Sequence, residues 1–423
     1  MLDIRLLRED AASVKERLRA RGGAHWELVD QVLASDEDRR KLETRRQELQ
    51  AQRNQTSKQI GQKKKAGEDT SEIEAAVKAL GEEMKALGTK ADEATDRQRA
   101  LLLQIPNLPQ LDCPLGADET ANPELRAWSQ KPAFSFRPKD HVELGADLGL
   151  FDFEAAASIS GSGYLVFRSA GAKLQRALIQ FLLDLHTTEH AYEEVAVPYL
   201  VQRDCMIGTG QLPKFEDDMY GLEDGQLFLA PTAEVPVTNL QREKLLSHKE
   251  LPIRNCAHTP CFRREAGAAG RESKGMIRMH QFDKVELVQV VRPEESQAVL
   301  ESLTGQAEKV LERLGLHYRT IELCTGDLGF SAAKTYDIEV WAPGHGAYLE
   351  VSSCSNFGDY QARRMNLRFK DEEKKNRFCH TLNGSGTALP RLYVALIETY
   401  QREDGSIAIP EALQPYFGAT EIR

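Results

Sequence analysis

Apolar residues between positions 71 and 103 recur at alternating steps of four and three. The series runs through Ile73, Val77, Leu80, Met84, Leu87, Ala91, Ala94 and Leu101, and only the polar Gln98 interrupts it. This is the a/d spacing of a coiled coil. The same spacing extended backwards gives a second, more polar seam with the apolar members Leu28, Val32, Leu42, Leu49 and Ile60. The pattern predicts two long helices, over about residues 27–65 and 71–103.

A turn signal separates the two predicted helices. Gly67 opens it, and Thr70 and Ser71 supply a candidate N-cap for the second helix. The two helices should therefore fold back on each other as an antiparallel hairpin. A helix of about 37 residues extends roughly 55 Å, which is too long for a compact core to cover. We expect an arm that reaches toward a large partner.

The charge distribution suggests what that partner is. The whole chain has a formal charge of −10, but residues 39–65 hold ten basic and two acidic side chains, and residues 66–105 hold five basic and nine acidic ones. The two segments could be solvated helices that attract each other. Alternatively, the basic helix binds a polyanion. Its candidate contacts are Arg39, Arg40, Arg45, Arg46, Arg53, Lys63, Lys64 and Lys65.

Prolines end the arm. Pro106 and Pro109 break the second helix, and further prolines up to Pro138 indicate an extended linker over 106–139. From residue 140 to 423, helical stretches alternate with short strand-like runs, such as a helix over 171–190 and a strand over Tyr192–Val197 that Pro198 ends. The pattern predicts an N-terminal domain over 1–105 and an α+β domain over 140–423.

Composition narrows the class of protein. The 423 residues are 41% hydrophobic and 28% charged, which is typical of a globular chain. No run approaches the ~18 apolar residues of a membrane span, and the N-terminus has no signal-peptide pattern. We expect a cytoplasmic location. The seven cysteines form no C-x-x-C pair, and the spacing of Cys256, His258 and Cys261 suits tetrahedral zinc poorly, so no zinc is expected.

A charged segment in the second domain carries the candidate chemistry. We expect a strand over 261–265, a loop over 266–275 and a returning strand over 277–291. A period of two then places charged and aromatic side chains on shared faces, namely Arg263 and Glu265 on the first strand and Arg278, His280, Phe282, Lys284 and Glu286 on the second. Such a face is either the wet side of a sheet or a nucleotide site built from guanidinium groups and a stacking ring. No G-x-G-x-x-G or P-loop motif offers another nucleotide site.

These residues resemble motif 2 of the class II aminoacyl-tRNA synthetases, through Phe262-Arg263-x-Glu265 and Arg278-x-x-x-Phe282. Pro198 after a helix and strand resembles motif 1, and the run from Gly384 to Arg391 resembles motif 3. Thr232-Ala233-Glu234 and the stretch from Tyr348 to Arg364 are similar to the bacterial-type seryl-tRNA synthetases, which also carry an N-terminal coiled-coil arm. The resemblance covers essentially the whole chain.

The resemblance implies a fold and a reaction. The fold would be the class II antiparallel sheet flanked by helices, with the arm binding tRNA. The reaction would join L-serine to ATP, release pyrophosphate, and transfer serine to the 3′ end of tRNA(Ser); whether tRNA(Sec) is also served stays open. The resemblance further implies a homodimer through motif 1, for which we expect the apolar run Leu174–Leu185 to need a partner surface. Two alternatives are a paralogue that charges a carrier protein and a non-catalytic RNA-binding relative.

The resemblance also assigns site residues. Arg263 would span the α-phosphate and the serine carboxylate, Arg391 would grip the γ-phosphate, and Glu350 with Ser353 would hold Mg²⁺ beside ATP. The implied ATP-binding set is Arg263, Arg264, Glu265, Arg278, Met279, Phe282, Glu350, Val351, Ser352, Ser353 and Arg391. The implied serine-binding set is Thr232, Ala233, Glu234, Glu286 and Ser385.

Five residues keep a plainer interpretation beside the functional one. The alternative role for Ser385 is that of a helix N-cap, whereas Ser352 would equally be a structural residue. His280 is expected to be a hydrogen-bonding residue and not a catalyst, because a carboxylate nucleophile needs no strong base. Arg271 and Lys274 would either meet the tRNA acceptor end or be solvated.

Overall fold

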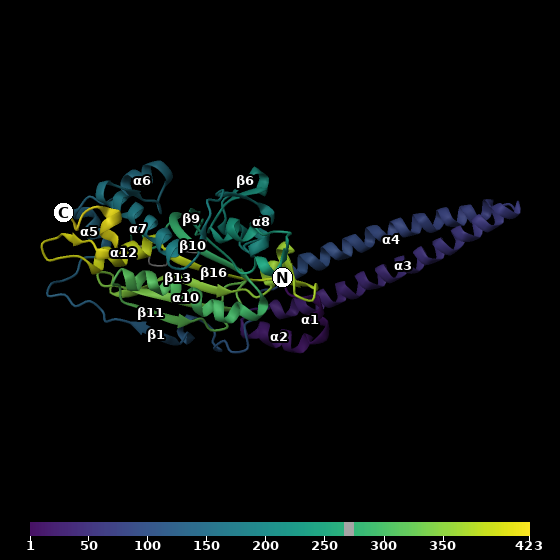
Figure 1. The fold of residues 1–423 in the computed structure, drawn as a ribbon, viewed down its shortest axis with the longest axis horizontal. Coiled ribbons are helices and arrows are strands. Elements are labelled where there is room, and N and C mark those ends of the chain that lie inside the picture. Colours follow the sequence, from purple (N-terminus) through teal and green to yellow (C-terminus); the bar gives the residue numbers. More distant parts are fainter. Residues whose placement is uncertain (266–274) are drawn as a thin grey trace. The chain divides into compact units, whose positions relative to one another are not determined.

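The computed structural model describes residues 1–265 and 275–423 (Figure 1). The chain divides into two compact units, Met1–Pro106 and Asn107–Arg423. The loop expected over 266–275, with Arg271 and Lys274, lies outside the described residues except for Gly275.

The first unit contains the helical arm that the a/d pattern predicts. Its helices are α1 (Ile4–Glu9), α2 (Ala11–Ala20), α3 (Leu28–Ala66) and α4 (Ser71–Leu103). Helices α3 and α4 pack against each other along their length, and contacts such as Arg45 to Glu83 and Lys64 to Glu74 show that they run antiparallel. Gly67, with φ of +76°, ends α3 in the left-handed conformation that glycine adopts easily. The antiparallel coiled-coil arm is confirmed.

The polar Gln98 has a partner across the arm. Its side-chain amide donates a hydrogen bond of 2.9 Å to Asp36 on α3, and Arg39 donates another of 3.0 Å to the same carboxylate. Burial acts to raise the pKa of Asp36, but these hydrogen bonds outweigh it and hold the pKa below its usual value. A buried polar pair therefore replaces one apolar layer, and it fixes the register of the two helices.

The second unit is built on an eight-stranded sheet within residues 107–265 and 275–423. Neighbouring strands are antiparallel, except that β4 runs parallel to β9. In spatial order the strands are β1 (Glu124–Trp128), β11 (Tyr318–Glu322), β12 (Lys334–Ala342), β13 (Ala347–Asn356), β16 (His380–Ala388), β10 (Gln281–Val291), β9 (Ile253–Phe262) and β4 (Glu193–Glu194). The expected α+β class with an antiparallel sheet is confirmed.

Helices α7 (Ser169–Thr188), α10 (Ser296–Arg313) and α12 (Leu389–Thr399) pack against this sheet around one hydrophobic core (Figure 1). The remaining helices are α5 (His141–Asp147), α6 (Phe153–Ser160), α8 (Arg203–Thr209), α9 (Glu234–Asn239), α11 (Tyr360–Met365) and α13 (Gln414–Phe417). Small sheets are formed by β2 (Phe151–Asp152), β3 (Val166–Phe167), β5 (Leu200–Gln202), β6 (Gly221–Leu222), β7 (Leu227–Leu229), β8 (Leu245–Ser247), β14 (Arg368–Lys370), β15 (Asn376–Phe378), β17 (Ile407–Ala408) and β18 (Glu421–Ile422).

The structure corrects the interpretation of α7. Leu174, Leu178 and Leu182 are fully buried in the core of their own chain, and Ala177, Phe181 and Leu185 are buried with them, whereas Ile179 and Leu183 are partly buried. The buried side chains of the run need no partner surface, and the argument for a dimer that rested on them was wrong.

The region 106–139 is also more ordered than a linker. Strand β1 pairs with β11 at the edge of the sheet, and the Asn107 side chain donates hydrogen bonds to the carbonyls of Ser331 and Phe357. These backbone and side-chain contacts bind the segment to the second unit, and proline content alone does not reveal them.

Strand ends were predicted less well. The strand expected over Tyr192–Val197 is regular only at Glu193–Glu194, because β4 is an edge strand that pairs with β9 alone. Strand β9 ends at Phe262 and β10 begins at Gln281, so Arg263, Glu265 and Arg278 lie just beyond the strands. Glu265 has φ of +51°, a left-handed conformation that an extended strand excludes.

Candidate active site

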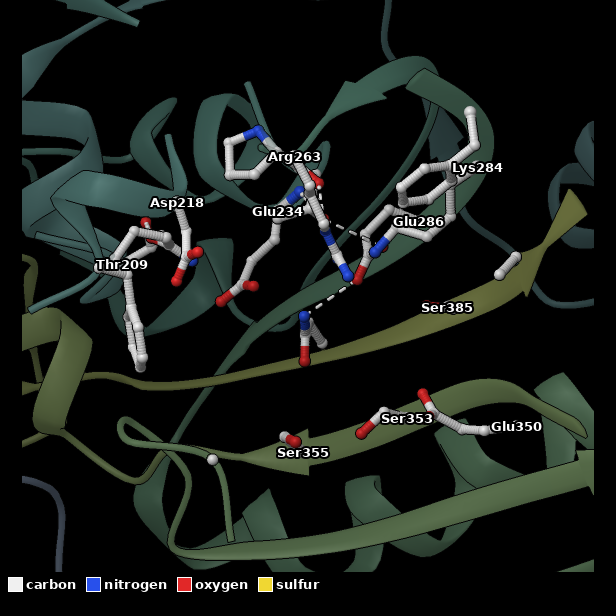
Figure 2. Close-up of a pocket in the computed structure, with 18 of the residues that line it drawn as sticks. Thr209, Asp218, Glu234, Arg263, Lys284, Glu286, Glu350, Ser353, Ser355 and Ser385 are labelled. Carbon is white, nitrogen blue, oxygen red and sulfur yellow. Dashed lines mark hydrogen bonds and ion pairs between the residues drawn. The ribbon is translucent and has the colours of Figure 1, made fainter. Parts of the chain in front are cut away.

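A cavity of about 860 Å³ opens over the strands β10, β13 and β16 and beside Arg263, which follows β9. In Figure 2, Arg263, Glu234 and Glu286 point into it from one side, and Ser355, Ser353 and Glu350 lie on β13 at the other. The size suits a nucleotide with a small second substrate.

Glu286 lies at the closed end of this cavity. Its side chain is fully buried, accepts hydrogen bonds from Thr232 Oγ1 at 3.2 Å and Asn383 Nδ2 at 2.9 Å, and forms an ion pair with Lys284. The register of β10 with β16 sets Ser385 directly opposite Glu286. A carboxylate and a hydroxyl thus face each other across two neighbouring strands.

A bulge at Gly386 produces this register. Val285 pairs with Thr387 and Glu286 pairs with Ser385, so Gly386 is the extra residue on β16. A Cβ at Gly386 would lie 2.8 Å from His186 Nε2, and one at Gly384 would lie 2.4 Å from Leu303. The glycines of this segment are therefore required by close packing against α7 and α10.

Glu234, a second buried carboxyl, lines the cavity beside Glu286. Gln361 donates a hydrogen bond of 2.7 Å to it, and Thr381 fixes the amide by donating to its oxygen at 2.7 Å. Burial, followed by the charge of Glu286, raises the pKa of Glu234 to about 7. This carboxyl changes its charge near neutral pH.

Arg263 and Phe282 form the next part of the wall. The Arg263 guanidinium lies 5.2 Å from the centre of the Phe282 ring, and its Nε donates to the Pro231 carbonyl at 3.3 Å. Arg278 and Glu265 form an ion pair at 2.6 Å, with both side chains partly exposed to the cavity. This wall combines a cation, an aromatic face and a charged pair.

The open end of the cavity is formed by Glu350, Ser353 and Arg391. Residues three apart on a regular strand point to opposite faces, but the β12–β13 register skips Val351, and this bulge brings Glu350 and Ser353 to the same side. Arg391, in the first turn of α12, donates to the Glu350 carbonyl at 2.8 Å and lies 3.4 Å from its carboxylate. The open end thus presents oxygen ligands beside a fixed guanidinium group.

The structure brings most of the proposed site residues to this one cavity. Its walls include Thr232, Glu234, Arg263, Glu265, Arg278, Met279, Phe282, Glu286, Glu350, Val351, Ser353, Ser385 and Arg391. The side chains of Ala233 and Ser352 are buried behind the wall, and Arg264 is exposed outside it. Ser352 Oγ donates to the Ser385 carbonyl at 2.6 Å and supports that residue from behind. His280 Nδ1 lies 3.1 Å from the Arg263 carbonyl, so its ring braces the Arg263 backbone.

Three polar residues that line or support the site were assigned no role from the sequence. The period of two places Lys284 on the charged face, but only the structure shows its ion pair with Glu286. Asn383 alternates with Ser385 along β16 and could have been found in the same way. Gln361 reaches Glu234 from α11, a contact that no local sequence pattern encodes.

The proposed tRNA-binding residues lie along α3. Arg39, Arg45, Lys63 and Lys64 form ion pairs with acidic side chains of the arm. Arg40, Arg46 and Lys65 are exposed, and Arg53 is half-buried. Both interpretations of the charge pattern therefore have support, because some basic groups serve the arm itself and others remain at the surface.

The described residues contain no cluster of three or more His, Cys, Asp or Glu side chains that could hold a metal ion. His258 Nε2 lies 2.7 Å from Asp283 Oδ1, and burial raises the pKa of the neighbouring Cys256 thiol to about 12.

No helix in the described ranges combines the length and apolar character that crossing a membrane requires.

A mainly antiparallel sheet with one arginine, Arg263, just beyond β9 and a second, Arg391, in the first turn of the helix that follows β16 is the arrangement of a class II aminoacyl-tRNA synthetase core. Residues 214–400 match the sequence model of the tRNA synthetase class II core domain (G, H, P, S and T), and residues 1–109 match that of the seryl-tRNA synthetase N-terminal domain. The chain belongs to the seryl-tRNA synthetase family.

Individual relatives agree with this assignment. The chain is 65% identical to a serine–tRNA ligase of Akkermansia muciniphila, over 100% of this chain and 99% of the relative. It is 54% identical to a serine–tRNA ligase of Thiobacillus denitrificans with the same coverage. A crystal structure of the Pyrococcus horikoshii seryl-tRNA synthetase complexed with ATP superposes with a TM-score of 0.93 at 37% identity, covering 100% of this chain and 99% of that one.

Proposed function

We propose that the cavity described above performs both steps of the family reaction, with the residue roles given below. As a member of the family, the chain is a ligase that activates serine with ATP and then transfers it to tRNA. The observation that carries the residue assignment is the convergence of Arg263, Glu286, Ser385, Glu350 and Arg391 on one cavity.

The closed end of the cavity takes serine. Glu286 and Thr232 accept hydrogen bonds from the substrate ammonium, and ionised Glu234 adds a second negative charge nearby. The substrate hydroxyl reaches Glu286 and Ser385, which face each other across β10 and β16. These groups are held by other side chains before substrate arrives, so little reorganisation is needed on binding.

The wall around Arg263 takes ATP. Phe282 stacks on adenine, Glu265 accepts from its amino group, and Arg278 contacts the phosphates. Arg263 holds the α-phosphate and the serine carboxylate together, so that the carboxylate oxygen attacks phosphorus while the bond to pyrophosphate breaks. Arg391 neutralises charge on the departing phosphates. The nucleophile is already ionised, so positioning and charge stabilisation carry this step.

The residues at the open end fit Mg²⁺. Glu350 has a half-exposed carboxylate and Ser353 a hydroxyl on the same side of β13, and both are hard oxygen ligands. Asp337 pairs with Ser353 across β12 and β13, and burial, followed by the charge of Glu350, raises the pKa of Asp337 well above its ordinary value, which favours the neutral form of this carboxyl. Glu350 and Ser353 would hold the ion, and when bound it neutralises charge on the phosphates.

The arm binds tRNA through the exposed basic side chains of α3. We assign tRNA(Ser) as the substrate and tRNA(Sec) as a second candidate. We further propose a homodimer located in the cytoplasm. A carrier-protein paralogue is disfavoured because such a protein would lack the long basic arm. A non-catalytic relative is disfavoured because Arg263, Glu286, Glu350 and Arg391 are all present.

Amino-acid-dependent ATP–pyrophosphate exchange tests the proposal. Exchange should depend on serine and should be far weaker with threonine or alanine. Addition of tRNA(Ser) and tRNA(Sec) transcripts then tests the second step separately. Exchange that is independent of serine would contradict the assignment of this cavity.

A further inference from the structure

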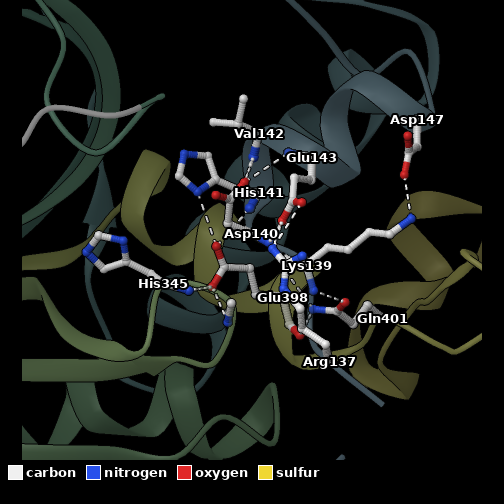
Figure 3. Close-up of polar contacts among 11 residues, drawn as sticks. Arg137, Lys139, Asp140, His141, Val142, Glu143, Asp147, His345, Glu398 and Gln401 are labelled. Atoms are coloured by element: carbon white, nitrogen blue, oxygen red, sulfur yellow. Dashed lines mark hydrogen bonds and ion pairs between the residues drawn. The ribbon is translucent and has the colours of Figure 1, made fainter.

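A buried carboxylate near the end of α12 binds two other segments of the chain. Glu398 is fully buried, and its two oxygens accept hydrogen bonds from the backbone N–H groups of His141, Gly344 and His345 at 2.9, 2.9 and 3.0 Å, and from the His141 ring at 3.1 Å (Figure 3). Four donors compensate one buried negative charge. None of these residues lines the active-site cavity.

The His141 ring contacts both Glu398 and the cavity wall. Its Nδ1 donates to Glu398, so Nε2 keeps its lone pair and accepts the backbone N–H of Met276 at 3.3 Å. Met276 is itself fully buried, and it begins the segment Met276–Met279 of the cavity wall. His141 thus connects α12 to the segment that carries Arg278.

The same segment is held from the other end of α12. Arg391 Nε donates to the Ile277 carbonyl at 3.3 Å, one residue beyond the Met276 contact. Gly275, with φ of +69°, precedes both contacts, and a Cβ there would lie 2.1 Å from His141 Nε2. The close approach of this backbone to the imidazole therefore requires glycine.

We propose that His141 is a positioning residue for ATP. By accepting the Met276 N–H while bound to Glu398, it fixes the backbone that directs Arg278 toward the phosphates. Serine binding does not involve this segment, so loss of His141 should affect ATP and leave serine almost unchanged. The inference rests on the proposed assignment of Arg278 and Arg391 to ATP.

Michaelis constants for ATP and for serine, measured by pyrophosphate exchange, test the inference. His141→Ala removes one hydrogen-bond acceptor and should raise KM for ATP about fivefold, with KM for serine within about twofold. Gly275→Ala inserts a methyl group against the ring and should raise KM for ATP about tenfold. In the double variant the methyl group has room, so its KM for ATP should stay within about twofold of that of His141→Ala alone.

Gly149→Ala is the matched control. Gly149 also has positive φ, +61°, but no atom lies within 4 Å of an added Cβ. This variant measures the backbone strain of alanine alone and should leave both constants within about twofold. Gly275→Ala removes no buried group, so it tests the contact even if His141→Ala fails to fold.

An unchanged KM for ATP in Gly275→Ala, fully additive effects in the double variant, or equal increases for ATP and serine would overturn the inference. Arg391→Ala separates this failure from failure of the proposed function. If Arg391→Ala weakens ATP binding and the Gly275 and His141 variants do not, only the role of His141 is wrong. If Arg391→Ala also leaves ATP binding unchanged, the ATP assignment itself fails, and the inference with it.

Discussion

Glu234 and Glu286 lie in the same pocket, but different groups surround them. Glu286 receives hydrogen bonds from Thr232 and Asn383 and a direct contact from Lys284. Glu234 receives its hydrogen bond from the neutral Gln361, and its burial near the Glu286 charge raises its pKa to about 7. One carboxylate is thus paired with a cation, whereas the other changes its protonation near neutral pH.

This difference predicts a pH dependence of serine binding. Glu234 is protonated below about pH 7 and negatively charged above it, so it attracts the substrate ammonium more strongly at pH 8 than at pH 6. KM for serine should fall severalfold between these pH values, and Glu234→Gln should remove that fall. Parallel pH profiles for the two proteins would contradict the role of Glu234.

The raised pKa of Glu234 also makes the stability of the folded chain depend on pH. A carboxyl whose pKa is raised in the folded state favours folding while it is protonated, and that advantage is lost as pH rises from about 4.5 to about 7. Glu234→Gln should therefore be more stable than the unsubstituted chain at pH 8, by about 1–3 kcal/mol, and not at pH 5. Thermal unfolding at the two pH values measures this difference.

Ser385 should determine discrimination against alanine. A site that hydrogen-bonds a substrate hydroxyl rejects the analogue without it, because its own polar groups are left unpaired. Ser385→Ala should lower kcat/KM for serine modestly and should reduce the serine-to-alanine preference by about tenfold or more. Pyrophosphate exchange with both amino acids measures the ratio, and an unchanged ratio would show that the hydroxyl binds elsewhere.

At the scale of elements, the helices of the arm were predictable and the strand register was not. The a/d pattern is local, so it placed α3 and α4 within one residue of their bounds. The bulges at Val351 and Gly386 depend on packing against neighbouring strands and helices, which no run of residues encodes. The resemblance supplied the site residues, whereas their arrangement around one cavity required the sheet.

The arm should serve tRNA and not serine activation. Replacement of residues 30–100 by a short linker should abolish serylation of tRNA and leave pyrophosphate exchange within a few-fold, because every proposed ATP and serine residue lies in the second unit. Aminoacylation and exchange assays on the same preparation test this division. Equal loss of both activities would contradict it.

Charge variants refine that test. Arg46→Ala with Lys65→Ala removes two exposed cations from α3, and Lys85→Ala with Lys90→Ala removes two exposed cations from α4 as a matched control. Only the α3 pair should raise KM for tRNA and reduce the salt dependence of binding.

At the scale of the whole molecule, the proposed homodimer needs a surface other than the buried face of α7. Leu111 and Leu115 are 89% and 81% exposed, and we take them as candidates for such a contact. Light scattering at micromolar concentration should give twice the chain mass of 47.4 kDa. Leu111→Ser with Leu115→Ser should weaken the dimer, and a monomeric unsubstituted chain would exclude it.

The account as a whole depends on Glu286 as the residue that holds serine. Glu286→Ala removes a buried charged acceptor, and the loss of such a hydrogen bond costs about 1.5–3 kcal/mol or more. The decisive measurement is serine-dependent pyrophosphate exchange by Glu286→Ala together with direct ATP titration. We predict that serine activation falls at least tenfold while ATP affinity stays within a few-fold, because Arg263, Phe282 and Arg391 remain. Near-native serine turnover in this variant would contradict the assignment of the pocket.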